Sequence, residues 1–333
     1  MMRPMSSVLQ ALAQRWMTFW FEPAAPTNLA VSRIVVYAPL AVFYLLHDYS
    51  VWGDVSPALY QPIWLFETLH LPVFSTSVLD VLQNVWKLSL FTAAIGLFTT
   101  ASCAVSAALG LYLLGLPHNF GQTYHFDAAI VFAFGVLALS RCGDALSVDA
   151  WRRASRNRAA ARVCPSGEYT WPIRLVWVTL SLVFFAAGVA KLWTSGFEWI
   201  ASDQMTLLLM RVQYHISDAD PVTNWGSYIA QHSIVARALA ALTLIIETTY
   251  PLALFRTRLR PVIVLAGIGL VVGIRLLMGP TFEHFLLLNA FWVPWDRVGV
   301  RLRARLWHDR PLPAFDDVPH KGRPPAREKA VHV

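Results

Sequence analysis

The stretch WPIRLVWVTLSLVFFAAGVAKLW, residues 171–193, is almost continuously apolar. An α-helix of this length, rising about 1.5 Å per residue, crosses a hydrocarbon core of roughly 30 Å. Its two charged residues lie near its ends, because Arg174 falls in the first turn and Lys191 in the last. The stretch therefore predicts a membrane-spanning helix with a cation near each end.

Lys191 lies on a face of this helix that also carries small residues. Ala187 and Gly188 precede it by four and three residues, and Phe184 precedes it by seven, so all four share one side. Small side chains allow a second helix to approach closely, and an ammonium held there needs water or a partner. Alternatively, Lys191 is close enough to the helix end to extend its ammonium to the membrane surface.

The composition of the whole chain agrees with a membrane protein. Of its 333 residues 56% are hydrophobic and 14% are charged, whereas a soluble domain carries about 25% charged residues. The net charge of +7 resides in loops and tails, as expected at a membrane surface rather than in a nucleic-acid-binding protein. The three cysteines, Cys103, Cys142 and Cys164, are too few and too scattered for a disulfide framework or a thiolate metal site.

Hydropathy along the chain predicts an all-α, polytopic transmembrane helical bundle of about eight spans. The expected spans are residues 29–47, 78–98, 101–116, 126–139, 171–193, 234–255, 261–278 and 282–295. Two long connections, residues 48–76 and 194–231, are rich in aromatic residues and contain a single arginine or lysine, Arg211. We expect them to be two extracytoplasmic cover segments that lie at the interface or re-enter the membrane.

The remaining parts of the chain are tails. Residues 1–28 predict a cytoplasmic tail with an interfacial helix at residues 8–21 and no cleavable signal peptide. Residues 29–296 form the transmembrane domain, and residues 297–333 a basic, proline-rich cytoplasmic tail. Basic residues concentrate in both tails and in residues 141–162 and 256–260. This distribution places both termini in the cytoplasm, and we expect a bacterial inner membrane.

With this topology, polar residues from several helices lie at one depth near the outer face. They are Lys191, His125, Asp127, Arg275, Glu283 and His284. Together they predict a polar chamber that opens outward beneath the cover segments. Arg33 joins this set as a supporting polar residue, although it lies toward the cytoplasmic end of its span.

Each of these residues also has a simpler interpretation. His125 is alternatively a loop histidine beside a helix start, and Asp127 a first-turn acid that complements the helix dipole. Arg275 is alternatively an anchor at the outer surface. Arg33 alternatively extends its guanidinium to the cytoplasmic surface.

Glu247 lies near the middle of its predicted span. A central acid costs about 2.5–3.5 kcal/mol on insertion, so it should be paired or protonated. Pro251 follows four residues later and predicts a kink, which favours a cavity beside the acid. Thr248 and Thr249 are further candidate partners, and the alternative is a structural ion pair with an arginine or lysine.

Motifs of soluble enzymes are absent from the sequence. It contains no phosphate loop, dinucleotide fingerprint, HExxH zinc motif or nucleophile elbow. His118 and His125 are seven residues apart in a loop, which is weak support for a metal, and we predict no metal site.

Three stretches resemble the HTTM transmembrane family, which includes the membrane part of vitamin K-dependent gamma-carboxylase. They are YHFDAAIVFAFGVLALSRCGDALSVDAW at residues 124–151, LVFFAAGVAKLWTSGF at residues 182–197, and NLAVSRIVVY at residues 28–37, which contains Arg33. The resemblance covers residues 28–296. It implies a helical bundle whose active chamber faces the extracytoplasmic side.

The resemblance also implies a chemistry. The lysine of the matching GV-x-KL motif, implicated in activating a reduced quinone, corresponds to Lys191, and the histidine of the fourth-span motif corresponds to His125. In that chemistry a deprotonated hydroquinone reacts with oxygen to give a strong base, and carbon dioxide then adds to a deprotonated glutamate. Lys191 would take the hydroquinone proton, and a neutral His125 would stabilise the oxyanion.

The sequence departs from the carboxylase pattern in three places. Ala190 stands where the carboxylase has a lysine before the matching Lys191, and Arg275 stands where it has a histidine. The large soluble region that captures the carboxylase's protein substrate has no counterpart here. Carboxylation of a peptide is therefore less expected than use of a quinone.

Two functions follow from these observations. The first is a quinone- or lipid-dependent enzyme, an oxidoreductase or carboxylase-like lyase, that uses a reduced quinone and acts among membrane lipids on a peptide, protein or lipidic substrate. The alternative is a non-catalytic membrane scaffold or maturation partner, in which Lys191, His125 and Glu247 fix helix packing. A transporter would need an inverted repeat, and the hydropathy shows none.

Overall fold

The computed structural model describes residues 7–121, 125–157, 163–214, 222–280 and 282–299, without the side chains of residues 7, 125–126 and 212–214. Its regular structure in these ranges is helical, with one isolated β-bridge between Ala24 and Ser166. Residues up to Trp295 form one compact unit, and those from Asp296 form a second. The first unit contains every helix discussed below.

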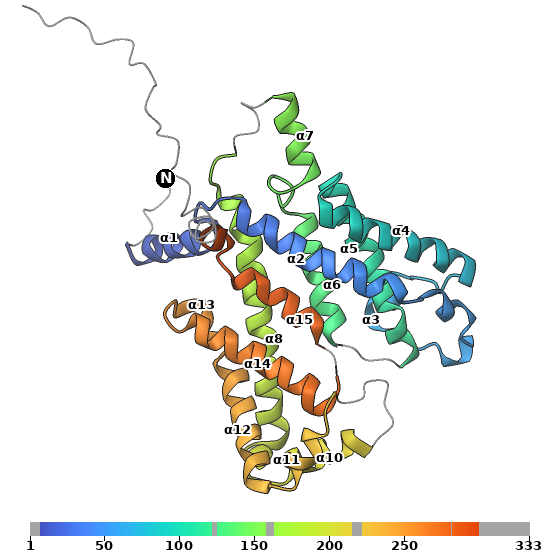
Figure 1. Ribbon diagram of the computed structural model, residues 1–333, viewed down its shortest axis with the longest axis vertical. Helices are drawn as coiled ribbons and strands as arrows, with labels where there is room; N and C mark the ends of the chain where they lie inside the picture. Colours follow the sequence, from blue (N-terminus) through green and yellow to red (C-terminus); the bar gives the residue numbers. More distant parts are fainter. Residues whose placement is uncertain (1–6, 122–124, 158–162, 215–221, 281, 300–333) are drawn as a thin grey trace, which may run out of the picture. The chain divides into compact units, whose positions relative to one another are not determined.

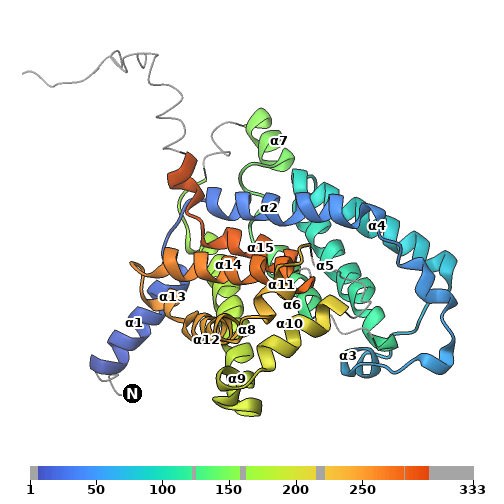
Figure 2. The same cartoon turned by 60° about the horizontal axis from the view of Figure 1, so that its bottom comes forward.

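Four helices from the N-terminal half form one group around α4 and α5. They are α2 (Thr27–Phe43), α4 (Thr76–Ile95), α5 (Thr99–Gly115) and α6 (His125–Ala138), whereas the preceding helix α1 (Ser7–Phe21) contacts residues 171–195 instead. Helix α4 contacts both α2 and α5, and α5 also packs against α6. Figures 1 and 2 show α2, α4 and α5 side by side in both views. The core of this group includes the fully buried Trp86 and Phe134.

The C-terminal helices pack around α8 (Trp171–Ser195). They are α12 (Ser233–Thr249), α13 (Leu252–Phe255), α14 (Arg260–Met278) and α15 (Glu283–Leu288), which continues into the 3₁₀ helix η6 (Asn289–Trp292). Helix α12 lies against both α8 and α14, as Figure 1 shows. Helix α6 contacts α8 and α15, so it joins the two groups.

Short helices occupy the connections. Residues 44–68 contain η1 (Tyr44–Leu46), η2 (Ser50–Asp54), η3 (Pro57–Leu59) and α3 (Trp64–Thr68). Residues 198–230 contain α9 (Glu198–Ala201), α10 (Gln204–Tyr214) and α11 (Trp225–Ala230). The others are η4 (Pro117–Phe120), α7 (Val148–Arg156) and η5 (Gly167–Tyr169). None of these short helices approaches the length that a membrane crossing needs.

Within the described residues, five segments are long and apolar enough to cross a membrane, as expected of an integral membrane protein. They are Thr27–Leu46, Thr76–Ile95, Thr99–Phe120, Gly167–Ser195 and Arg260–Met278. The other three expected spans correspond to shorter helices: α6 has 14 residues, α12 has 17, and α15 has 6. At about 1.5 Å per residue, α6 is roughly 21 Å long.

Local sequence explains how two of these helices end. Gly96 adopts φ +71 after α4, and Gly96 and Leu97 donate to the carbonyls of Ala93 and Thr92, which is a Schellman motif. The helix α12 ends at Thr249, and α13 begins again at Leu252, on either side of Pro251. Because proline cannot donate to the helix ladder, the interruption predicted at Pro251 is present.

Candidate functional site

Lys191 and Glu247 form an ion pair between α8 and α12. The Lys191 Nζ lies 2.7 Å from Oε1 and 2.8 Å from Oε2 of Glu247, so both carboxylate oxygens accept from one ammonium. The third polar contact of Nζ, with the carbonyl oxygen of Ala187, is long at 3.5 Å. The side chains are 23% and 7% exposed, respectively. Lys191 therefore turns toward α12 instead of extending its ammonium to the membrane surface.

The pair is possible because the two helices approach closely one turn earlier. A Cβ atom at Gly188 would lie 2.8 Å from Thr248 Cγ2 and 3.1 Å from Glu247 Cβ. Small residues permit this kind of contact between membrane helices. Gly188, which lies on the same face of α8 as Lys191, is therefore the residue at which α12 approaches α8 closely.

The threonines after Glu247 do not bind its carboxylate. Thr248 Oγ1 donates to Leu244 O at 2.7 Å, and Thr249 Oγ1 donates to Ile245 O at 2.6 Å. Both hydroxyls are therefore used within their own helix, contrary to the expectation that they would help to satisfy the acid. Lys191 is the partner that Glu247 requires.

Trp199 adds an aromatic face to the pair. The Lys191 Nζ lies 5.4 Å from the centre of the Trp199 ring, within the range of a cation–π contact. Trp199 belongs to α9, in the second aromatic connection. The aromatic character of this connection is visible in the sequence, but no sequence pattern links Trp199 to Lys191.

A second set of polar contacts lies between other elements. Tyr44 and His284 are buried, and the Tyr44 hydroxyl is 2.6 Å from His284 Nε2. Asp127 Oδ2 lies 3.5 Å from His118 Nε2, which joins the start of α6 to η4. Asp127 and His284, both expected in the outer chamber, thus have partners other than Lys191 and Glu247.

Arg33, in the N-terminal half of α2, has a structural role. It is fully buried, and its Nη1 and Nη2 donate to the carbonyl oxygens of Cys142 and Leu146 at 2.7 and 2.6 Å. The alternative that Arg33 reaches the surface is therefore wrong. Its hydrogen bonds hold residues 142–146 to α2, and they do not involve Lys191 or Glu247.

Arg275 lies in the last turn of α14. Its Nη1 donates to the carbonyl oxygen of Gly279, the residue that ends this helix at φ +96. A cation in this place also complements the negative end of the helix dipole. This contact is compatible with the anchoring interpretation of Arg275.

The side chain of His125 lies outside the described residues. Its backbone begins α6, which packs against α8. The approach of His125 to Lys191 stays a prediction. Among the described side chains, no group of three or more histidine, cysteine, aspartate or glutamate residues gathers in a way that would hold a metal ion.

Comparisons with known proteins add no assignment. No protein-family model matches the chain, and no curated protein or solved structure matches it either.

Proposed function

We propose that this membrane protein is an enzyme in which Lys191 and Glu247 handle a proton for a lipid-soluble substrate of the quinone class. The observation that carries the proposal is the ion pair itself, in which one ammonium is held by both oxygens of a buried carboxylate at 2.7 and 2.8 Å. Ionisable residues inside a membrane are costly and are usually retained for function. The resemblance to the HTTM family also supports Lys191 as the residue that handles the proton.

The residues around Lys191 fit a planar, hydroxyl-bearing ring. The ammonium has a third N–H whose protein contact is long, at 3.5 Å, so it can donate to a ligand oxygen. Trp199 offers a ring face beside it. A reduced quinone, when bound, supplies the acidic hydroxyl and the electrons.

The pair can change its protonation state without creating an isolated charge. When the proton moves from Lys191 Nζ to Glu247 Oε1, both side chains become neutral, which a low-dielectric surrounding tolerates. The neutral amine can then accept a proton from a bound hydroxyl group. Glu247 is thus the proton acceptor that lets Lys191 act as a base.

The rest of the proposal concerns the setting. The proposed enzyme has eight spans, both termini in the cytoplasm and its site toward the extracytoplasmic face, in a bacterial inner membrane. The segregation of basic residues supports this arrangement. His125 would stabilise the oxyanion, and a carboxylase-like step on a peptide or protein would extend the same chemistry.

The second candidate function is a scaffold in which the pair only locks α8 to α12. The close contact of Gly188 with Thr248 favours it, because the pair sits in a tight helix crossing. Removing one partner of such a buried pair typically costs about 3–5 kcal/mol, whether or not the pair has a catalytic role. A loss of folding in single variants would therefore not distinguish the two functions.

The Lys191→Arg variant separates them. Arginine keeps the cation and binds carboxylates in a two-pronged manner, but it does not give up its proton in proteins. Oxygen uptake with a reduced naphthoquinone is measured in lipid nanodiscs, together with the midpoint of thermal unfolding. We expect the variant to keep its fold and lose uptake. Uptake at the wild-type rate in this variant would contradict the proposal, and the absence of uptake in the wild type itself would favour the scaffold.

A further inference from the structure

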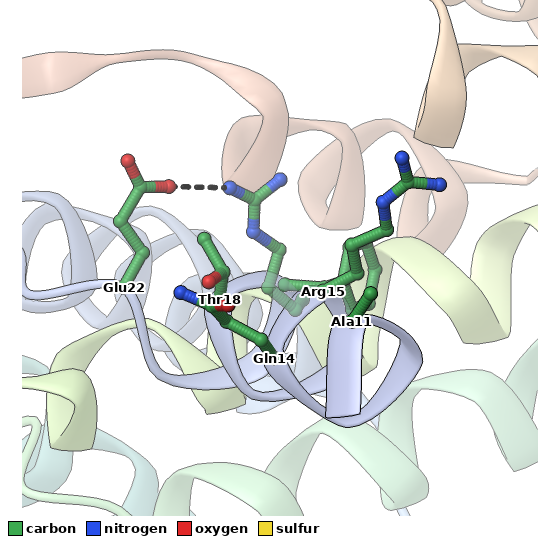
Figure 3. A pocket seen from close by; sticks show the side chains of 7 residues that line it. Ala11, Gln14, Arg15, Thr18 and Glu22 are labelled. Atoms are coloured by element: carbon green, nitrogen blue, oxygen red, sulfur yellow. Dashed lines mark hydrogen bonds and ion pairs between the residues drawn. The ribbon is translucent and has the colours of Figure 1, made fainter. Parts of the chain in front are cut away.

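A polar groove lies between α1 and the first turn of α8, at the end of α8 opposite to Lys191. It has a volume of about 480 Å³. It is lined from one face of α1 by Ala11, Gln14, Arg15 and Thr18, from just after the end of that helix by Glu22, and from α8 by Arg174. Figure 3 shows Arg15 and Glu22 on either side of Thr18, with Arg15 on α1 and Glu22 just after its end.

The Arg174 guanidinium is held firmly at the wall of the groove. Its side chain is 16% exposed, and its central carbon lies 4.4 Å from the Trp177 ring and 5.3 Å from the Phe19 ring. Its acidic partner is Glu22, which is itself 61% exposed and lies at a long 3.4 Å. Aromatic faces orient a guanidinium without neutralising it, so Arg174 keeps donors for a further acceptor.

The groove carries an excess of positive charge. Arg15 is exposed and lines the opening, with no hydrogen bond or ion pair to another described residue. The guanidinium of Arg260 lies on the same Trp177 ring, at 4.6 Å from its centre. Two lining arginines and a third nearby outweigh the single carboxylate of Glu22. The groove is therefore suited to an anion.

The face of α1 next to the groove is apolar, which indicates that the groove lies at the membrane interface. Val8, Leu12 and Trp16 are 66%, 56% and 63% exposed and lie on a face next to the polar residues. A helix with this division of residues lies in the membrane interface with its apolar face among the acyl chains. Helix α8 belongs to one of the segments that are long and apolar enough to cross a membrane. Arg174, in its first turn, therefore lies at headgroup depth.

We propose that this groove binds the phosphate of an anionic phospholipid, whose acyl chains lie along the exposed apolar face of α1. Arg15 and Arg174 hold the phosphate oxygens, and Gln14 and Thr18 offer further hydrogen bonds. Glu22 competes with the phosphate for Arg174. The inference is independent of the Lys191 chemistry, because it concerns the opposite end of α8.

The test titrates the purified full-length protein in detergent with short-chain phosphatidylglycerol and follows the midpoint of thermal unfolding. Short-chain phosphatidylcholine and inorganic phosphate are titrated at the same concentrations. We expect phosphatidylglycerol alone to raise the midpoint, because the site requires both a net negative headgroup and an attached acyl chain. Equal stabilisation by phosphatidylcholine or by inorganic phosphate would overturn the proposal.

Three variants locate the effect. Arg15→Gln should weaken the apparent affinity roughly fivefold, the factor expected for one cation near an anionic surface, and it removes no described contact. Glu22→Gln should strengthen it, because Arg174 loses its competing carboxylate. Arg256→Gln, at an exposed arginine outside the groove, is the control and should leave affinity unchanged. Unchanged affinity in the Arg15→Gln variant would also overturn the proposal.

Discussion

Gly188 on α8 faces Thr248 on α12 so closely that a Cβ atom at Gly188 would lie 2.8 Å from the Thr248 methyl carbon. One turn later, Lys191 reaches both carboxylate oxygens of Glu247. The close crossing and the ion pair are therefore parts of one contact. A change in the spacing of the two helices should alter the pair even when both charged residues are kept.

Gly188→Ala tests this dependence. The added methyl group must push α12 away, and overpacking of this kind costs about 1–3 kcal/mol. Gly269→Ala in α14 is the matched control, because nothing lies within 4 Å of a Cβ there. We expect thermal unfolding in detergent to show a lower midpoint for Gly188→Ala and no loss for Gly269→Ala. Equal midpoints for the two variants would contradict the close crossing.

Arg33 should be essential for stability even though it lies away from the proposed chemistry. Arg33→Ala removes the donors to the buried carbonyl oxygen of Cys142 and to the partly buried one of Leu146, and each hydrogen bond from a charged group contributes about 1.5–3 kcal/mol. Arg33→Lys should recover only part of the loss, because an ammonium cannot reproduce the fork geometry. Unfolding midpoints would reveal this order, and a wild-type midpoint for Arg33→Ala would refute the assigned role.

Asp149 should give the protein a pH-dependent element of stability. Burial raises the pKa of Asp149, but hydrogen bonds from Thr99 and Phe98 outweigh it and lower the pKa below its ordinary value of 3.8. A lowered carboxyl pKa stabilises the folded state above the ordinary value, and the contribution disappears as pH falls through the folded value. The residue caps the start of α5, so its loss should cost about 0.5–2 kcal/mol.

The measurement compares unfolding midpoints of the wild type and Asp149→Asn between pH 7 and pH 3. The difference should be full at pH 7 and shrink below about pH 4, where the wild-type carboxyl becomes protonated. A difference that stays constant over this range would show that the charge of Asp149 has no part in the cap.

The native cysteines test the proposed orientation. Cys164 is exposed, whereas Cys103 and Cys142 are buried. With the proposed topology Cys164 faces the cytoplasm, so a membrane-impermeant maleimide should label it in inside-out vesicles and not in right-side-out vesicles. Detergent-solubilised protein serves as the control for reactivity. Labelling in right-side-out vesicles would reverse the orientation.

Parts of this site follow from the sequence because they depend on local pattern. The apolar length of residues 171–193, the small residues before Lys191 and the interruption at Pro251 are all local features. The central position of Glu247 predicted that it needs a partner, and a lysine was among the alternatives. These expectations rest on helix periodicity and on the cost of a buried charge.

Other parts depend on tertiary contacts that no local pattern contains. Lys191 and Glu247 are 56 residues apart, so the sequence did not identify them as partners. The position of Trp199 depends on how the connection after α8 folds back. The sequence predicts Arg33 in the supporting network of the outer chamber. In the structure, its guanidinium instead donates hydrogen bonds to main-chain carbonyl oxygens more than 100 residues away. Main-chain acceptors leave no trace in the side-chain pattern.

The most direct test of the central claim replaces both charges at once with Lys191→Met and Glu247→Met. A buried ion pair exchanged for apolar residues of similar size often leaves a protein equally or more stable, so folding and function can be separated. Quinol-dependent oxygen uptake is measured in nanodiscs for this double variant and the wild type. The account predicts a folded protein, with an unfolding midpoint at or above that of the wild type, and no uptake. A folded double variant with wild-type uptake would contradict it.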